Sequence, residues 1–388
     1  MQVSPVQTSS DKRPRIISSF AVAILFILPI LIGAISYYYR FVGGLLIALT
    51  LLLCGVAYRY AALRAGCTFL ASLFLALTVA ELIEPVLYRQ QKIANELITP
   101  HDYWYMRKFG WIGLKGNHRF ALVKPDGRMI YDAIYTIGDD GFRVTPLDPT
   151  SGDKIVFYGD SFTFGEGLNN DETLPYYVAQ LTGRPVKNYG FHGYGVQQPL
   201  AILKSDLDTS GSVNFLLTAP WHAERAACKV FYSAGSPKYE IAADGSVVQT
   251  GLCRMITTLG PLGKIINLSN LYQLYLATRS TEVTDADYDR YLAIIGDMAR
   301  ISRERGQKFV IGFIRADESL FKGTHFTNEK ILDRLRTMAD EVVDLTLAPR
   351  NEDLDPKYYH DASDKHPSAL ANQARAKILK EFFEHQSK

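Results

Sequence analysis

The chain has 388 residues, of which 47% are hydrophobic and 21% charged, and its formal net charge at pH 7 is only +2. This composition excludes a disordered chain, a collagen-like repeat and a basic protein that binds nucleic acid through a dominant positive field. The apolar residues are unevenly distributed, because almost all long apolar runs lie before residue 90. The remaining ~300 residues are enough to bury a large core.

Three apolar runs at the start of the chain predict membrane helices. Residues 16–36 and 41–58 carry no charge, and a third run over about 66–87 has two glutamates near its end. The first run is long enough to cross roughly 30 Å of hydrocarbon. A cleavable signal peptide is the alternative, but the run is long for one and a second run follows at once. We therefore expect a membrane anchor of about three transmembrane helices within residues 1–90.

The basic residues around these runs indicate their orientation. Five lie before the first run or between the second and third, namely Lys12, Arg13, Arg15, Arg59 and Arg64, and three lie on the other side, namely Arg40, Arg89 and Lys92. This bias predicts a cytoplasmic N-terminus, and three crossings then place the rest of the chain outside the cytoplasm. Cys228 and Cys253 would there be free to form a disulfide, with two buried thiols as the alternative.

The rest of the chain predicts an α/β domain behind a small lead-in. Residues 91–150 contain short alternating segments broken by glycine turns, which favour a linker and a β-rich lead-in. From residue 151, apolar strand-like runs alternate with helical stretches; the strands are expected at 154–159, 213–219, 308–314 and 341–347. Such alternation is typical of a parallel sheet with helices on both faces. An insertion at about 226–286 interrupts it, and we expect a hairpin and a helix rich in Leu and Tyr there.

Two glycine-containing motifs follow predicted strands. The block Gly159-Asp160-Ser161-Phe162 places a serine at the carboxyl edge of the sheet, where its hydroxyl and its own N–H can face a reacting carbonyl. A serine that merely caps a helix is the alternative. The glycine-rich block 188–195 follows the next strand, and a glycine there lets the backbone donate a second N–H to an oxyanion.

A third motif, residues 361–368, precedes the last helix. A serine nucleophile needs a base to take its proton and a carboxylate to orient that base. His366 and Asp364 can fill these roles, although a solvated loop with a chance histidine remains open. A metal site is a further alternative, with His360, Asp361, Asp364 and His366 as candidate ligands.

Together, the order and spacing of GDSFTFGEGL, NYGFHGYGVQQ and the Asp-x-His block resemble the SGNH/GDSL hydrolase family, over about residues 135–388. The resemblance implies a three-layer α/β/α, flavodoxin-like fold over 151–388, and a bacterial branch whose members are often membrane-anchored. It implies Ser161 as nucleophile, Gly193 as an oxyanion donor, His366 as base and Asp364 as its orienting carboxylate.

The sequence departs from the family pattern at two places. The family's third block, Gly-x-Asn-Asp, is replaced by a segment over 218–225 without asparagine. His222 can supply the missing oxyanion N–H or be structural, and Arg225 can bind a substrate anion or pair with Glu224. The residue three before the base is Ser363, so Asp364 is preferred over Asp361.

The expected function is that of a serine esterase or O-acyltransferase that acts through an acyl-serine on an acylated cell-envelope glycan or lipid. No cofactor, metal or nucleic acid is expected; a membrane and envelope-biosynthesis proteins are expected partners. The protein would lie in the bacterial inner membrane, with a periplasmic C-terminal domain. The alternative is a weak or inactive SGNH-like binding or scaffold protein of an envelope polysaccharide machinery.

Overall fold

The computed structural model describes residues 48–49, 51–53, 61–88, 96–98, 103–147, 153–253, 272, 282–347 and 355–385. The chain divides into two compact units, one of residues 1–92 with 261–278 and one of residues 93–260 with 279–388.

The longest described element of the first unit is helix α3 (Ala61–Tyr88). Its stretch Ala61–Ala80 is long and apolar enough to cross a membrane, by length and composition. Large apolar side chains such as Leu63 and Phe69 are exposed on it, as expected of a helix that contacts lipid. The other two predicted spans lie outside the described residues, except for positions 48–49 and 51–53, and they stay predictions.

Five parallel strands form the central sheet of the second unit, in the order β12–β11–β8–β6–β7. They are β6 (Ile155–Gly159), β7 (Val186–Gly190), β8 (Val213–Thr218), β11 (Lys308–Phe313) and β12 (Glu341–Asp344). The predicted parallel α/β sheet is therefore confirmed. Counted along the chain, this is the 2-1-3-4-5 order of flavodoxin-like folds, in which ligands bind where the order reverses. That point lies between the carboxyl ends of β6 and β8.

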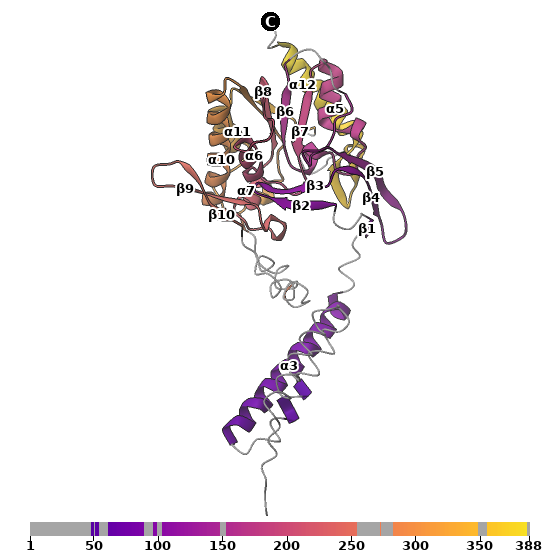
Figure 1. Cartoon of the computed structure of the whole chain (residues 1–388), viewed down its shortest axis with the longest axis vertical. Coiled ribbons are helices and arrows are strands. Elements are labelled where there is room, and N and C mark those ends of the chain that lie inside the picture. Colours follow the sequence, from indigo (N-terminus) through magenta and orange to yellow (C-terminus); the bar gives the residue numbers. More distant parts are fainter. Residues whose placement is uncertain are drawn as a thin grey trace, which may run out of the picture. The chain divides into compact units, whose positions relative to one another are not determined.

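Helices cover both faces of the sheet (Figure 1). They are α5 (Leu174–Thr182), α6 (Gln197–Leu203), α10 (Asp285–Glu304), α11 (Asn328–Arg336) and α12 (Ala369–His385). On β6, Ile155 and Phe157 pack with α5 and α12, whereas Val156 and Tyr158 belong to the core beneath α6, α10 and α11. Successive side chains of a strand point to opposite faces, so a central strand must be apolar throughout.

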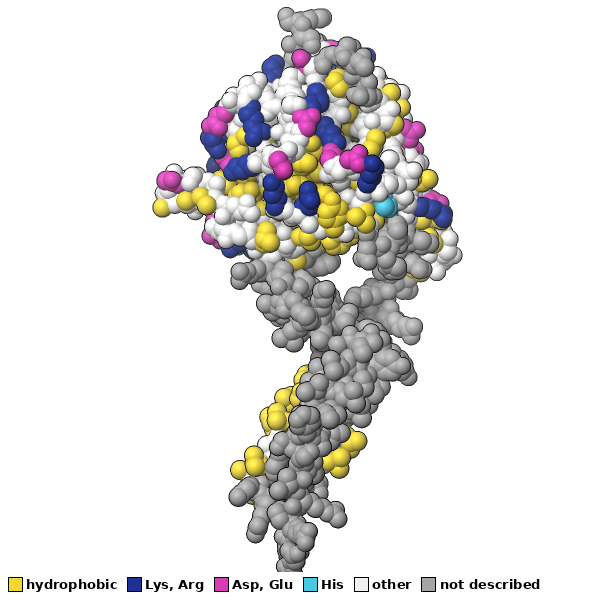
Figure 2. Space-filling model, in the orientation of Figure 1, with side chains coloured by type: hydrophobic (Ala, Val, Ile, Leu, Met, Phe, Trp, Pro, Cys, Tyr) yellow, Lys and Arg dark blue, Asp and Glu magenta, His cyan; other side chains and the backbone are white. Residues whose placement is uncertain are grey.

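The surface of the second unit carries no dominant charge on the side that Figure 2 shows. Basic and acidic side chains lie interspersed there, in keeping with the net charge of +2. A charged ligand would therefore be recognised by local groups rather than by a general field.

The described part of residues 91–150 consists mainly of strands. Strands β1 (Glu96–Ile98), β4 (Gly116–Val123) and β5 (Met129–Ile137) form an antiparallel sheet, and β2 (Trp104–Arg107) pairs with β3 (Gly110–Gly113).

Arg143 joins the lead-in to the start of the α/β domain. Its guanidinium is buried and donates to the carbonyl oxygens of Phe164, Gly165 and Leu168 and to Asn170 Oδ1. These acceptors lie in the loop that follows Ser161, so the lead-in supports that loop directly.

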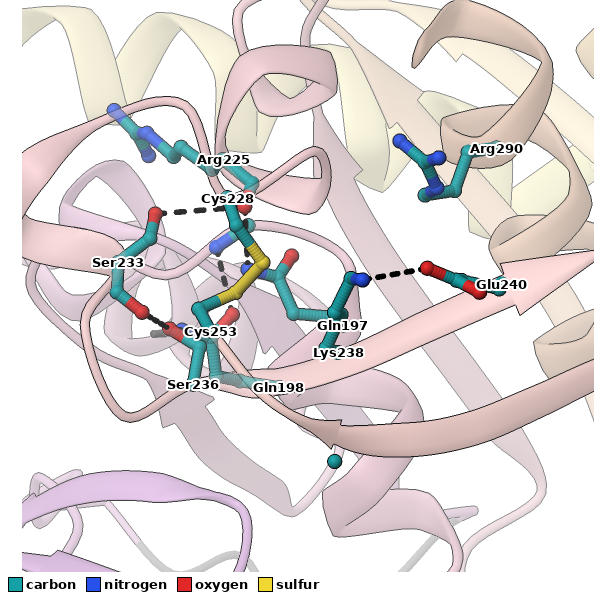
Figure 3. The surroundings of a disulfide bond; sticks show 12 residues. Gln197, Gln198, Arg225, Cys228, Ser233, Ser236, Lys238, Glu240, Cys253 and Arg290 are labelled. Carbon is teal, nitrogen blue, oxygen red and sulfur yellow. Dashed lines mark hydrogen bonds and ion pairs between the residues drawn. A yellow bond between two sulfur atoms is a disulfide. The ribbon is translucent and has the colours of Figure 1, made fainter. Parts of the chain in front are cut away.

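The insertion begins with the predicted hairpin, β9 (Pro237–Ile241) paired antiparallel with β10 (Val247–Leu252). Cys228 and Cys253 are joined in a disulfide with a Cα–Cα distance of 5.3 Å, which ties the segment before the hairpin to its end (Figure 3). The helix predicted later in the insertion falls outside the described residues, apart from position 272.

The remaining elements of the second unit are short. They are α4 (Ser161–Phe164), α7 (His222–Ala226), β13 (Tyr359–Asp361), β14 (Asp364–Pro367) and 3₁₀ turns at Asn170–Glu172, Phe231–Ser233, Glu318–Phe321 and Pro356–Tyr358.

Candidate active site

A sharp turn at the end of β6 places Ser161 at the carboxyl edge of the sheet. Gly159 closes the strand with φ +157°, and a Cβ there would lie 2.1 Å from Thr163 Oγ1, so only glycine fits. Asp160, not Ser161, caps helix α4: its Oδ1 accepts the N–H of Phe162 at 3.0 Å. The serine is thereby held at the first position of α4, with its side chain lining a cavity.

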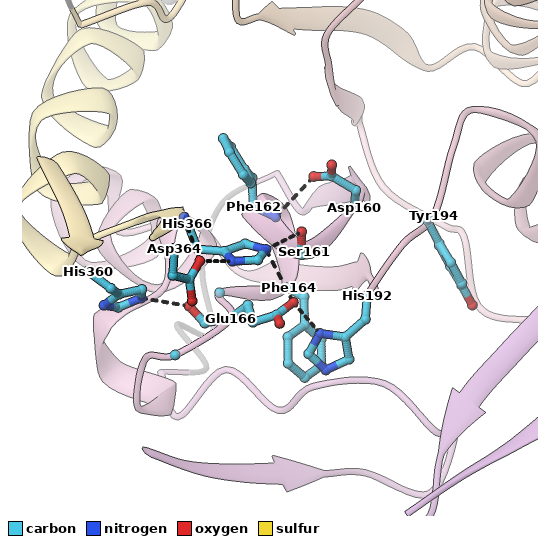
Figure 4. A network of polar contacts seen from close by, with 12 residues as sticks. Asp160, Ser161, Phe162, Phe164, Glu166, His192, Tyr194, His360, Asp364 and His366 are labelled. Atoms are coloured by element: carbon cyan, nitrogen blue, oxygen red, sulfur yellow. Dashed lines mark hydrogen bonds and ion pairs between the residues drawn. The ribbon is translucent and has the colours of Figure 1, made fainter. Parts of the chain in front are cut away.

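Ser161, His366 and Asp364 lie in a continuous line of hydrogen bonds (Figure 4). Ser161 Oγ is 3.0 Å from His366 Nε2, and His366 Nδ1 is 2.5 Å from Asp364 Oδ1. Asp364 Oδ1 also accepts the backbone N–H of His366 at 3.1 Å, which fixes the carboxylate against the ring. This is the geometry of a nucleophile, its base and an orienting carboxylate.

Strands β13 and β14 form a hairpin, and its other two candidate metal ligands, Asp361 and His360, have different partners. Asp361 Oδ2 is 2.7 Å from Lys124 Nζ, and its Oδ1 accepts the N–H of Ser363. His360 Nε2 lies 2.9 Å from the carbonyl oxygen of Glu166. Within the described ranges, no group of three or more His, Cys, Asp and Glu side chains is placed to hold a metal ion. Asp364 is therefore the carboxylate of this hairpin that contacts the His366 ring.

Three side chains from the segment after β8 converge on Asp160. Its Oδ2 is 3.0 Å from His222 Nε2 and 2.8 Å from Arg225 Nη1. Trp221 Nε1 donates to the same oxygen at 3.3 Å. Burial raises the pKa of Asp160, but His222 and Arg225 outweigh it and hold the pKa well below its usual range. The Asp160 carboxylate thus connects the turn between β6 and α4, which carries Ser161, to helix α7.

His222 does not line the cavity, and both of its ring nitrogens have protein partners. Nε2 faces Asp160, and Nδ1 lies 2.9 Å from Thr218 Oγ1. Burial lowers the pKa of His222, which favours the neutral ring. With Nε2–H donated to Asp160 and Nδ1 accepting from Thr218, no N–H is left for a substrate. We therefore revise the oxyanion role predicted for His222: it positions Asp160.

Gly193 lies in the loop after β7, at φ +66°. Trp111 Nε1 donates to the carbonyl oxygen of His192 at 2.9 Å and so holds this loop. Among the described residues, no acceptor is bonded to the N–H of Gly193 or of Ser161. Both N–H groups are thus unpaired, but of the two residues only Ser161 lines the cavity.

Arg225 lines the cavity, although its charge has a partner. Besides Asp160, its Nη1 donates to the carbonyl oxygen of Tyr194 at 2.7 Å. The guanidinium therefore neutralises Asp160 at the wall of the cavity.

Glu166, which sequence reasoning missed, places a second carboxylate beside the base. Its Oε2 lies 3.4 Å from His366 Nε2 and 2.6 Å from His192 Nδ1 (Figure 4). Burial lowers the pKa of His366, but the carboxylates of Glu166 and Asp364 outweigh it and raise the pKa to about 9. Glu166 belongs to the run GDSFTFGEGL, yet nothing local marks it, because its partners come from two distant loops.

The cavity beside Ser161 has a volume of about 430 Å³, within the range of small-molecule sites. Ser161 and His366 lie in its wall with residues that follow β8, β11 and β12, including Trp221 and Ala316. Helix α12 contributes Arg375. The cavity thus opens along the carboxyl edge of the sheet.

Models of known protein families and the curated proteins yield no match to this chain. Solved structures, by contrast, include matches to this chain. The chain is similar to a member of the lipolytic G-D-S-L family from Veillonella parvula, at 15% identity and TM-score 0.34, over 60% of this chain and 98% of that one. It is similar to a carbohydrate esterase family 2 enzyme with a carbohydrate-binding domain from Corynascus thermopiles (Myceliophthora fergusii), at 14% identity and TM-score 0.35, over 70% and 78%.

A third similar structure is the salicylyl-acyltransferase SsfX3 from a tetracycline biosynthetic pathway, at 14% identity and TM-score 0.36, over 62% of this chain and 56% of that one. Of these three descriptions, that of the Veillonella parvula protein names the G-D-S-L family. At such TM-scores the likenesses carry no argument of their own, and the argument for function rests on the geometry above.

Proposed function

We propose that the second unit is an SGNH/GDSL-type serine esterase domain that works through an acyl-Ser161 intermediate. One observation carries the proposal: Ser161, His366 and Asp364, from opposite ends of the domain sequence, form an unbroken hydrogen-bonded line at the wall of a cavity. A serine that served only to cap a helix would need neither the histidine nor the carboxylate.

In the proposed reaction, Ser161 Oγ attacks the ester carbonyl carbon while its proton passes to His366 Nε2. The carbonyl oxygen becomes an oxyanion, bound by the N–H groups of Ser161 and Gly193. The intermediate collapses to the acyl-serine, the ester C–O bond breaks, and the departing alcohol takes the proton from His366. Asp364 keeps the ring oriented and stabilises its positive charge.

A second hydroxyl compound then attacks the acyl-serine, again with His366 as base. Water gives an esterase, and a sugar hydroxyl gives an O-acyltransferase. Both reactions use the same residues, so we propose acyl transfer from an ester, and an experiment must distinguish water from a sugar hydroxyl as the acceptor.

The test uses the full chain in detergent, a serine-directed fluorophosphonate and a short-chain ester. Ser161→Ala should abolish labelling, and Ser161→Ala and His366→Ala should each lower turnover about as far as the double variant, by roughly 10⁴-fold. Ser246→Ala, at an exposed serine in the β9–β10 turn, is the matched control and should label normally. Full turnover by Ser161→Ala in a preparation free of other esterases would refute the proposal.

A second candidate is a weak or inactive binding protein of an envelope polysaccharide machinery. It is favoured by the third block, which lacks the family's asparagine and whose His222 is bonded to Asp160 and Thr218. Loss of one oxyanion donor costs roughly 3–4 kcal/mol of transition-state stabilisation. A protein that binds acylated glycan but reacts with no fluorophosphonate would establish this candidate instead.

We further propose that the domain is anchored in the bacterial inner membrane and acts outside the cytoplasm on an acylated envelope glycan or lipid. The apolar stretch Ala61–Ala80 supports the anchor, and the Cys228–Cys253 disulfide supports an oxidising compartment. Proteins of envelope biosynthesis are then the expected partners.

A further inference from the structure

The cavity that contains Ser161 also contains a buried arginine with unused hydrogen-bond donors. Arg375, on α12, is 5% exposed and lines the cavity. Its Nε donates to the carbonyl oxygen of Leu345 at 3.1 Å. Among the described residues, neither Nη has a hydrogen-bond partner, and no carboxylate pairs with the guanidinium.

Two other arginines of this unit, the buried Arg143 and the partly buried Arg225, show how the donors of a structural arginine are satisfied. Arg143 distributes its donors over three carbonyl oxygens and an amide oxygen. Arg225 is paired with Asp160 at 2.8 Å. Arg375 has one carbonyl acceptor, on Nε, and no carboxylate, so both of its Nη groups lack a partner among the described residues. Burial of a charge with unpaired donors is strongly unfavourable, and an anionic ligand would compensate it.

The other charges around the cavity largely cancel. Arg315 is paired with both Glu329 and Asp344, and Asp364 is bonded to His366. On the face that Figure 2 shows, basic and acidic side chains are interspersed, so no dominant negative field on that face compensates Arg375. Arg375 is thus a local, fixed positive charge in the wall of the cavity.

We propose that Arg375 binds an anionic group of the substrate while the ester lies at Ser161. The two free Nη donors of a guanidinium form a planar fork that matches a carboxylate or a phosphate. The substrate class is therefore an ester that carries a carboxylate or phosphate, such as an acylated uronic acid or an acylated polyol phosphate. The proposal rests on the proposed function for the ester, but the anion site itself stands on Arg375 alone.

The test compares esters that differ only in charge. The full chain in detergent is assayed with an O-acetylated methyl glucuronoside and its uncharged methyl ester, and with O-acetyl glycerol phosphate and O-acetyl glycerol. We expect kcat/KM to favour the anionic member of at least one pair by about tenfold or more, the usual gain from a charged hydrogen bond. The favoured pair tells carboxylate from phosphate.

Variants then test whether Arg375 causes the preference for the anionic ester. Arg375→Met should lower the anionic-to-neutral ratio of kcat/KM at least about tenfold, whereas Arg375→Lys should retain part of it. Lys377→Met is the matched control, because Lys377 is exposed two positions further along α12 and does not line the cavity. Thermal unfolding of each variant reports whether the buried substitution has disturbed the fold, and the ratio is read only on folded protein.

A wild-type ratio near one for both pairs would overturn the proposal, whatever the variants do. So would a ratio that Arg375→Met leaves unchanged. If no ester is turned over through Ser161, the proposed function fails, but the anion site is still tested by calorimetric binding of methyl glucuronoside and inorganic phosphate against methyl glucoside. Binding of an anion that Arg375→Met and Arg375→Lys do not weaken would then exclude the site.

Discussion

At the scale of single residues, two aspartates three positions apart, Asp361 and Asp364, contact different partners. Asp364 Oδ1 is 2.5 Å from the His366 ring, whereas Asp361 is paired with Lys124 and bonded to Ser363. We expect Asp364→Asn to lower kcat by roughly 10³-fold or more, because the amide no longer stabilises the charged ring. Asp361→Asn should stay within a few-fold of wild type in the same ester assay. A severe loss in Asp361→Asn alone would contradict this assignment.

We expect Glu166 to influence the pH at which His366, the proposed base, is neutral. His366 faces Glu166, Asp364, Asp160 and His360, and the carboxylates raise its pKa to about 9 although burial lowers it. His366 must be neutral to accept the serine proton, so kcat/KM should rise with pH to an acid-limb midpoint near pH 9.

Glu166→Gln removes the negative charge that favours protonated His366. The pKa of His366 then falls, and the acid limb of kcat/KM should move to lower pH by roughly one to three units. Glu304→Gln, at an exposed residue of α10, is the control and should leave the limb in place. An unmoved limb in Glu166→Gln would exclude a coupling between these two groups.

The three residues of the proposed triad could be singled out from the sequence because each lies in a short block with its own spacing, and the structure brings their side chains together. Glu166 and Arg375 could not. Their importance comes from contacts with distant loops and from a missing partner, and neither leaves a pattern in the local sequence. His222 was predicted as an oxyanion donor for the same reason: its position in the third block is visible, but its hydrogen bonds to Asp160 and Thr218 are not.

At the scale of elements, the strands of the sheet are the most predictable feature. The central strands β6, β8 and β11 are short, mostly apolar runs, because a strand covered by helices on both faces has no polar side. The edge strands β7 (VKNYG) and β12 (EVVD) carry polar side chains. The β13–β14 hairpin that carries His366 could not be predicted in this way. Its sequence, YHDASDKHP, has no apolar alternation, and it forms a hairpin through turn and pairing contacts instead.

The disulfide holds the element that supports Asp160. Cys228 follows α7 by two residues, and the bond to Cys253 closes a loop with a sequence separation of 25 (Figure 3). In the full chain with Cys54→Ala and Cys67→Ala, thiol labelling should fail without reductant. The further change of Cys228 and Cys253 to serine should lower the free energy of unfolding by roughly 3–4 kcal/mol. Efficient labelling of both cysteines in the unreduced protein would show that the bond does not form in solution.

At the scale of the whole molecule, the first 90 residues differ in composition from the rest of the chain. The first 90 residues hold the long apolar runs, and the remainder folds as an α/β domain with charges of both signs on the face that Figure 2 shows. The proposed esterase domain, joined to the predicted membrane anchor, would meet substrates that are themselves near the membrane. An envelope glycan or lipid ester fits this arrangement better than a freely diffusing metabolite does.

The side of the membrane on which the domain acts follows from the number of crossings. Three apolar runs and the excess of Lys and Arg at the N-terminus and between the second and third runs predict a tail outside the cytoplasm. Alkaline phosphatase, which is active only after export, should be active when fused after Lys388 and inactive when fused after Arg64, the matched control in the predicted cytoplasmic loop. Inactivity after Lys388 together with stable expression would mean an even number of crossings. The disulfide and the proposed envelope substrate would then both lose their basis, while the Ser161–His366–Asp364 chemistry would remain.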